Sequence, residues 1–122
     1  MPSRRRDPGS CLPLTPAAFH VLLGLADGEK HGYAILKDIT RRTDGRLKLG
    51  VSTLYGAVQR LESEGLIQES SARPDPALDD ERRRYFRITD FGRDVVRAEL
   101  RRFEDALSMA RAKKLKPSPG VA

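Results

Sequence analysis

Within residues 52–67, STLYGAVQRLESEGLI, hydrogen-bonding and apolar side chains recur with the spacing of a helix. At about 100° per residue, Leu54, Val58 and Leu61 fall in one narrow stripe that can pack against a core. The opposite face is small and polar, whereas an ordinary solvated helix face is rich in Lys and Glu. Gln and Arg on such a face can pair with base edges in the major groove of DNA. The residues expected to contact DNA are Ser52, Thr53, Tyr55, Gln59 and Arg60.

The start and the centre of this helix indicate a close partner. Gly56 lies in the exposed face, where a glycine costs about 1 kcal/mol relative to Ala, so we infer that another molecule approaches the backbone there. Ser52 and Thr53 place hydroxyl groups beside the first amides of the helix, a position that favours phosphate. Gln59 and Arg60 are the candidates for base contacts. The alternative is a surface helix of unremarkable composition.

The sequence after this helix predicts two strands joined by a tip. Gly65 is a natural helix stop, and residues 66–70 alternate weakly, as in a strand. A polar stretch that contains Pro, residues 71–81, precedes residues 82–89, in which β-forming residues stand among cations. A recognition helix followed by two strands is the plan of a winged helix. The candidates for phosphate contacts on the second strand are Arg83 and Arg84.

Two helices are expected before the recognition helix. Thr15 as N-cap and Pro16 at the first helical position begin one helix, which continues through Ala26. Its residues are apolar nearly all the way round, so it must be covered on more than one side. The second helix is expected over residues 33–42, with a short strand over residues 46–49 after it. The candidates for DNA backbone contacts on the second helix are Lys37 and Arg41.

A long final helix is expected to begin with Thr89 and Asp90 as caps and to reach about Lys114. At 1.5 Å per residue it would be about 39 Å long, too long to lie within a winged helix of this size. Its apolar residues alternate steps of four and three, the spacing of a two-helix seam. The alternative is that it folds back onto its own domain, but the first helix also has an uncovered side, so we expect a homodimer. The residues expected at the subunit interface are Phe19, Leu22, Val96, Leu100, Phe103 and Leu107.

Together these features resemble the PadR family of bacterial transcriptional regulators, and the brevity of the chain is similar to the small subgroup of that family. Members of this subgroup follow the winged helix with little more than one dimerising helix. The resemblance covers roughly residues 12–93 and implies a regulator that binds double-stranded DNA; some members respond to aromatic compounds. The matching motifs are Leu14-Thr15-Pro16, His31-Gly32-Tyr33, Thr53-Leu54-Tyr55, Leu61-Glu62, Glu64-Gly65-Leu66-Ile67, and Arg84-Tyr85-Phe86-Arg87-Ile88-Thr89 with Gly92 and Arg93 close behind.

The charge of the chain points towards nucleic acid, but it is unevenly spread. The net charge is +6 and the pI is about 9.9. Residues 15–88 carry 12 basic and 11 acidic residues and thus only +1, while residues 1–14 carry +2 and residues 89–122 carry +3. We therefore expect affinity for DNA to come from local arrangement and from both tails.

At 122 residues the chain is expected to form one domain with tails. We expect a disordered basic arm over residues 1–11 and a winged helix-turn-helix domain over residues 12–88. A dimerisation helix over residues 89–115 and a disordered tail over residues 116–122 are expected to follow.

The opening of the chain could be mistaken for a signal peptide, but Asp7 and Pro13 interrupt the pattern. The longest apolar run is far below the roughly 20 residues that span a bilayer, so we expect a cytoplasmic protein without membrane contact. Cys11 cannot form an internal disulfide because it is the one cysteine of the sequence. An inert thiol is expected, and a disulfide between two subunits is the alternative.

The sequence offers no support for catalysis. His20 lies in an apolar helix and is expected to pack in the core or at an interface, and His31 is expected to cap or pack at a turn. Neither stands in a Cys, His and Asp cluster with metal-ligand spacing, and no glycine-rich phosphate loop or nucleophile motif occurs. No enzyme activity, metal or cofactor is expected.

The sequence thus predicts a mainly α fold with a small β wing, in which a winged helix-turn-helix is followed by a long C-terminal dimerisation helix. The predicted function is that of a homodimeric transcriptional repressor that binds a pseudo-palindromic operator. Two alternatives stay open. One is a degenerate winged helix that serves as a protein–protein adaptor. The other is a sensor of a small aromatic effector, bound between the final helix and the partner's first helix.

Overall fold

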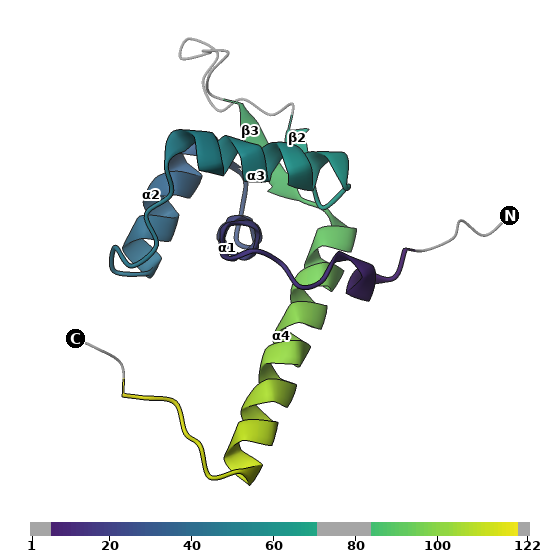
Figure 1. The fold of residues 1–122 in the computed structure, drawn as a ribbon. Helices are drawn as coiled ribbons and strands as arrows, with labels where there is room; N and C mark the ends of the chain where they lie inside the picture. Colours follow the sequence, from purple (N-terminus) through teal and green to yellow (C-terminus); the bar gives the residue numbers. More distant parts are fainter. Residues whose placement is uncertain (1–5, 71–83, 120–122) are drawn as a thin grey trace, which may run out of the picture.

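Across residues 6–70 and 84–119, which the computed structural model describes, four α-helices accompany a short 3-10 helix and a three-stranded sheet (Figure 1). The prediction of a mainly helical fold with a small β wing is confirmed. The elements in chain order are η1 (Pro8–Cys11), α1 (Pro16–Leu25), β1 (Lys30–His31), α2 (Gly32–Arg42), α3 (Val51–Ser63), β2 (Ile67–Ser70), β3 (Tyr85–Ile88) and α4 (Asp90–Ala112).

Side-chain caps fix the starts of three helices. The side chain of Thr15 accepts a hydrogen bond at 3.1 Å from the amide three residues later, at the start of α1. His31 Nδ1 does the same at 3.1 Å for α2, and Thr89 Oγ1 at 3.0 Å for α4. Each cap satisfies an amide that has no partner within its helix. The starts of α1 and α4 lie where they were predicted, whereas α2 begins at Gly32, one residue before its predicted start.

Helix α1 lies at the centre of the domain and packs against α2, α3, α4 and β3 (Figure 1). Its residues Val21 and Leu22 are fully buried. The nearly all-round apolar character of α1 is therefore largely explained by neighbours from its own chain. The buried apolar residues that surround α1 are Ile35, Ile39, Leu54, Val58, Leu61, Leu66, Ile67, Phe86, Val95 and Val96.

The sheet has β3 in the middle, in the order β1-β3-β2, with both pairings antiparallel. Residues 46–49, expected to form a strand, do not form one. The Leu47 amide donates to Thr43 Oγ1 at 3.1 Å, and the Arg46 amide donates to the Thr43 carbonyl at 2.9 Å. These turn hydrogen bonds fold the segment back towards the end of α2. The third strand is β1 instead, in which Lys30 pairs with Phe86.

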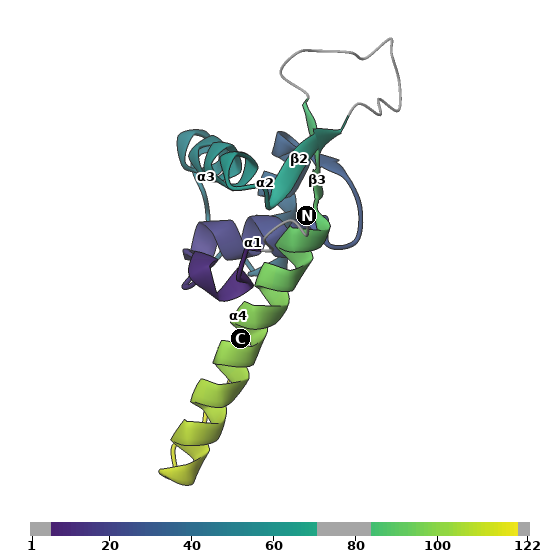
Figure 2. The ribbon, with the colours of Figure 1, turned by 90° about the vertical axis from the view of Figure 1, so that its right-hand side faces the viewer.

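Helix α4 has 23 residues, about 35 Å at 1.5 Å per residue, and it runs away from the domain (Figure 2). Val95, Val96 and Glu99 near its start are buried, and no residue of α4 after Glu99 is buried. The predicted long final helix is confirmed, and its last turns extend beyond the domain (Figure 2). Among the described residues, no helix combines the length and the apolar character needed to cross a membrane.

The residues before α1 lie against the domain. The Leu14 amide donates to Glu99 Oε2 on α4 at 2.8 Å, and Arg6 donates to the Glu64 carbonyl at the end of α3. The Arg6 guanidinium also lies 4.8 Å from the centre of the Phe91 ring. The expectation of a disordered arm over residues 1–11 therefore differs from the structure at residues 6–11. Residues 1–5, with Arg4 and Arg5, lie outside the described residues.

Candidate nucleic-acid interface

The face of α3 that points away from the core is exposed and polar, and Figure 1 shows α3 along the outer edge of the domain. A Cβ atom added at Gly56 would meet no heavy atom within 4 Å. Packing within the described part of the chain therefore does not require a glycine at this position. The exposed members of the predicted contact set on α3 are Ser52, Thr53, Gln59 and Arg60.

The two ends of this face offer different chemistry. At the start of α3 the N-cap is Gly50, so no capping side chain bonds to the first amides, and Ser52 and Thr53 are exposed beside them. Hydroxyls and amides in this position suit phosphate. Towards the other end, Arg60 Nε lies 3.7 Å from Glu64 Oε2, with the Arg60 side chain largely exposed. Such an exposed pair contributes at most about 1 kcal/mol, so Arg60 can exchange Glu64 for another acceptor.

Tyr55 lies elsewhere than expected, because its ring packs between α3 and the start of α2. A Cβ atom added at Gly32 would come within 2.2 Å of the Tyr55 hydroxyl oxygen. Tyr55 is half-buried, whereas its neighbours on the outer face are exposed. The glycine at position 32 thus admits the phenol, and Tyr55 sets the spacing of the two helices. We assign it to packing rather than to the outer face.

The exposed side of α2 carries a stripe at intervals of four residues. Tyr33 is 59% exposed, the Lys37 ammonium lies 5.1 Å from the centre of its ring, and the Arg41 side chain is 79% exposed. Lys37 and Arg41 are predicted backbone contacts, and the structure brings them together with Tyr33. Tyr33 lies outside the predicted contact set, although its four-residue spacing from Lys37 indicates the same face of the helix.

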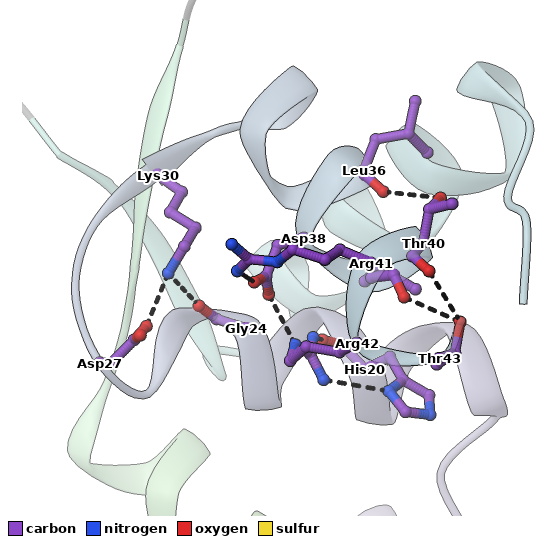
Figure 3. Close-up of polar contacts among 11 residues, drawn as sticks. His20, Gly24, Asp27, Lys30, Leu36, Asp38, Thr40, Arg41, Arg42 and Thr43 are labelled. Atoms are coloured by element: carbon purple, nitrogen blue, oxygen red, sulfur yellow. Dashed lines mark hydrogen bonds and ion pairs between the residues drawn. The ribbon is translucent and has the colours of Figure 1, made fainter. Parts of the chain in front are cut away.

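Asp38 joins this stripe to α1 (Figure 3). Its two carboxylate oxygens bind Arg41 Nη2 at 2.8 Å and Arg42 Nε at 2.7 Å, and Arg42 Nη2 donates to the His20 carbonyl on α1 at 3.0 Å. Burial raises the pKa of Asp38, but the hydrogen bonds from Arg42 and Arg41 outweigh it and hold that pKa below its ordinary value. Asp38 stays ionised and thus links the exposed Arg41 at the end of the stripe to the less exposed Arg42, which contacts α1.

Arg84, a predicted phosphate contact, is engaged with two carboxylates. Arg84 Nη2 lies 2.8 Å from Glu69 Oε1 and 3.5 Å from Glu62 Oε1. The hydrogen bond to Glu69 raises the pKa of Arg84, with burial acting in the opposite direction. The guanidinium thus has partners in its own chain, a feature that its position in a basic run could not reveal. Arg83 and the predicted tip over residues 71–81 lie outside the described residues.

The residues predicted for the subunit interface fall into two groups. Leu22 and Val96 are buried in the core of their own chain, so they offer no surface to a second copy, which differs from the expectation. Leu100 and Phe103 are 42% and 46% exposed. Four predicted interface residues are thus left with exposed or half-buried side chains on α1 and α4: Phe19, Leu100, Phe103 and Leu107.

The histidines and acids do not form a metal site within the described ranges. No group of three or more His, Cys, Asp or Glu residues there is arranged to hold a metal ion. His20 Nδ1 lies 3.4 Å from Arg42 Nη1. Burial and then the charge of Arg42 lower the pKa of His20, so His20 is neutral at pH 7. His31 caps α2, as its place at the turn suggested.

Comparison with known proteins places this arrangement in a family. The model of the transcriptional regulator PadR-like family matches residues 21–98. Among solved structures, a transcriptional regulator from Clostridium thermocellum is similar at 28% identity with a TM-score of 0.66, over 79% of this chain and 87% of that one. Bacillus subtilis PadR in complex with operator DNA is similar at 20% identity with a TM-score of 0.62, over 90% of this chain and 54% of that one. The likeness to the second structure shows the fold alone.

A curated relative extends beyond this chain. An uncharacterized 37.1 kDa protein in transposon TN4556 of Streptomyces fradiae is 40% identical over 91 residues. The match covers 75% of this chain, and the chain spans only 22% of the length of that relative. The resemblance that the sequence motifs indicated is confirmed by the match over residues 21–98. The chain belongs to the PadR-like family of transcriptional regulators.

Proposed function

We propose that this protein is a cytoplasmic transcriptional repressor that binds a pseudo-palindromic DNA operator as a homodimer. The observation that carries the DNA-binding part is the exposed face of α3, on which Gln59 and Arg60 flank an open approach to Gly56. The major groove of DNA accepts a helix of this kind. Bacillus subtilis PadR, whose structure was solved in complex with operator DNA, shares the fold.

In this proposal the polar residues have separate roles. Gln59 and Arg60 read base edges, because amide and guanidinium groups can form paired hydrogen bonds with adenine and guanine. Ser52 and Thr53 bind phosphate at the start of α3. Lys37 and Arg41 bind the DNA backbone, a contact that positions the protein but carries no sequence information. Repression follows if the operator overlaps a promoter, because the bound dimer then blocks access to it.

The dimer rests on the uncovered apolar side of α1 and α4. Leu100 and Phe103 of α4 are exposed apolar residues, and the Phe103 ring lies beside Phe19 of α1. Exposed apolar side chains that lie together are typical of an interface, and a twofold axis would let each α4 cover the other. Two copies then present two α3 helices, and the half-sites should lie about 10 base pairs apart, centre to centre.

The first test is a footprint on the DNA that flanks the gene for this protein, followed by titration of the protected duplex and a scrambled duplex at several salt concentrations. We expect the affinity to fall linearly on a log–log plot against salt, with a slope of about −0.9 for each phosphate contacted. Absence of salt-sensitive binding to any duplex would contradict the proposal and favour the adaptor alternative.

A further inference from the structure

Arg84 joins three elements at the base of the wing. It stands one residue before β3, and its guanidinium binds Glu69 on β2 at 2.8 Å. The same nitrogen lies 3.5 Å from Glu62 on α3, and the guanidinium carbon lies 5.2 Å from the centre of the Phe86 ring. One cation therefore contacts both the recognition helix and the strand that follows it.

The two carboxylates stand on either side of a sharp turn. Helix α3 ends at Ser63, β2 begins at Ile67, and Gly65 between them has a φ of 80°, in the left-handed region that favours glycine. Glu62 precedes this turn and Glu69 follows it. Because Arg84 contacts both carboxylates, it links the end of α3 to β2 through side chains, in addition to the backbone of the turn.

The charge of these three residues does not suit a phosphate site. Two carboxylates and one guanidinium have a combined charge of −1, so Arg84 brings no net positive charge to DNA. A carboxylate near a DNA-binding face repels phosphate, so Glu62 and Glu69 taken alone oppose binding. Their effect on binding becomes favourable only if they act through Arg84 on the shape of the DNA-binding surface.

We propose that Glu62, Glu69 and Arg84 form a positioning clamp that fixes the wing relative to α3 and thereby sets the preference of this protein for its operator. The clamp deepens the proposed function and rests on it. Arg84 is a positioning residue and not a phosphate contact. Glu62 and Glu69 act by holding the planar guanidinium, whose fork of donors an ammonium cannot reproduce.

The clamp and simple electrostatics predict opposite signs for the same substitution. Glu62→Gln and Glu69→Gln each remove a negative charge, so electrostatics alone predicts tighter binding to every duplex. The clamp predicts a lower ratio of operator affinity to scrambled-duplex affinity, by roughly two- to fivefold. The matched control for the titration is Asp105→Asn, which removes an exposed carboxylate that pairs with Arg101 on α4, away from α3 and the wing. Glu64→Gln, whose carboxylate pairs with Arg60 and not with Arg84, is the control for measurements without DNA.

Arg84→Lys distinguishes a positioning role of Arg84 from a phosphate contact. It keeps the positive charge but removes the planar set of guanidinium donors that binds two carboxylates. If the clamp is correct, Arg84→Lys lowers the ratio of operator affinity to scrambled-duplex affinity as much as Arg84→Ala does. If Arg84 is a phosphate contact, Arg84→Lys keeps most of the affinity that Arg84→Ala loses. The titration uses the full chain, the operator and the scrambled duplex at matched salt. The proposal is overturned if Glu62→Gln and Glu69→Gln behave like Asp105→Asn, or if Arg84→Lys restores the binding that Arg84→Ala loses.

Hydrogen exchange of the β2 and β3 amides tests the clamp without DNA, so its failure can be told from failure of the proposed function. Glu69→Gln should speed exchange of these amides in the folded protein, and Glu64→Gln should leave it unchanged. If the wild type binds no duplex but Glu69→Gln speeds exchange, the DNA-binding function is wrong and the clamp is structural only, which overturns its proposed role. Unchanged exchange in Glu69→Gln contradicts the clamp itself.

Discussion

The ring of Phe19 on α1 stands edge-on to the ring of Phe103 on α4, with centroids 5.4 Å apart and planes at 70°. The Phe19 ring meets His20 in a second edge contact, also at 5.4 Å. These contacts lie where α4 leaves its own domain, and Phe103 stays 46% exposed in spite of them. Phe103 thus has one side on its own chain and one side available to a second copy.

Phe103→Glu should convert the dimer into a monomer. In the proposed dimer the substitution places a charge in the apolar surface that the second copy would cover, and burying an unpaired charge is costly. The control is Ser108→Glu, which adds the same charge to an exposed position about 140° around the same helix. Light scattering at micromolar concentration should report a dimer for the wild type and for the control. A folded wild-type monomer would contradict the homodimer.

Gly56→Ala should make the protein more stable and bind DNA less well. Ala at an exposed helical position stabilises the helix by about 1 kcal/mol relative to Gly, and a Cβ there meets no heavy atom within 4 Å in the described part of the chain. If DNA approaches the backbone at Gly56, the added methyl group stands in its way. Urea denaturation and duplex titration measure the two effects.

Ser108→Ala is the control for this pair of measurements, because it changes helix propensity far from α3. It should alter stability slightly and leave operator affinity unchanged. If Gly56→Ala binds the operator as tightly as the wild type, nothing approaches α3 closely at this position.

Stability should fall between neutral and mildly acidic pH because of His20. Burial and the charge of Arg42 lower the pKa of His20 below its ordinary value of 6.5. As pH falls through 6.5, the unfolded chain takes up the proton before the folded chain does, so the free energy of unfolding decreases. From about pH 7.5 to about pH 5.5 the decrease should be smaller for His20→Gln than for the wild type. Urea denaturation at one fixed protein concentration measures it, and equal decreases in both proteins would refute the assignment.

The sequence predicted the helices well because their signals are local. The caps at Thr15 and Thr89 and the apolar stripe of residues 52–67 depend on neighbours within a few positions. The short strand β1 escaped prediction because Lys30 and His31 are strand residues only through their pairing with β3. The alternation at residues 46–49 wrongly predicted a strand, because the Leu47 amide donates to the Thr43 hydroxyl in a turn instead of pairing with a neighbouring strand.

The candidate site was harder to predict because its side chains have distant partners. Arg84 stands in a basic run, but the two carboxylates that hold it are 15 and 22 positions away in the sequence. Val96 fits the seam spacing of α4, yet the first turns of that helix are covered by their own domain. The sequence identifies a cationic side chain or an apolar helix face. Only the folded structure shows whether that side chain is already paired, or that face already covered, by another part of the same chain.

The roles assigned to α3 and α2 predict different kinds of defect. Gln59→Ala should lower operator affinity by about 1–3 kcal/mol and flatten the preference at one position in each half-site. Lys37→Ala should weaken the operator and the scrambled duplex alike, and it should reduce the steepness of the salt dependence by about 0.9 for each phosphate that the protein no longer binds. Both residues are exposed, so neither substitution should disturb the core.

The ratio of operator affinity to scrambled-duplex affinity, measured at one salt concentration for the wild type, Gln59→Ala and Lys37→Ala, tests the central claim most directly. We predict that the ratio falls roughly 5- to 150-fold in Gln59→Ala and stays near the wild-type value in Lys37→Ala. If Gln59→Ala keeps the wild-type ratio, or if the ratio falls equally in both variants, the outer face of α3 is not the surface that reads DNA sequence.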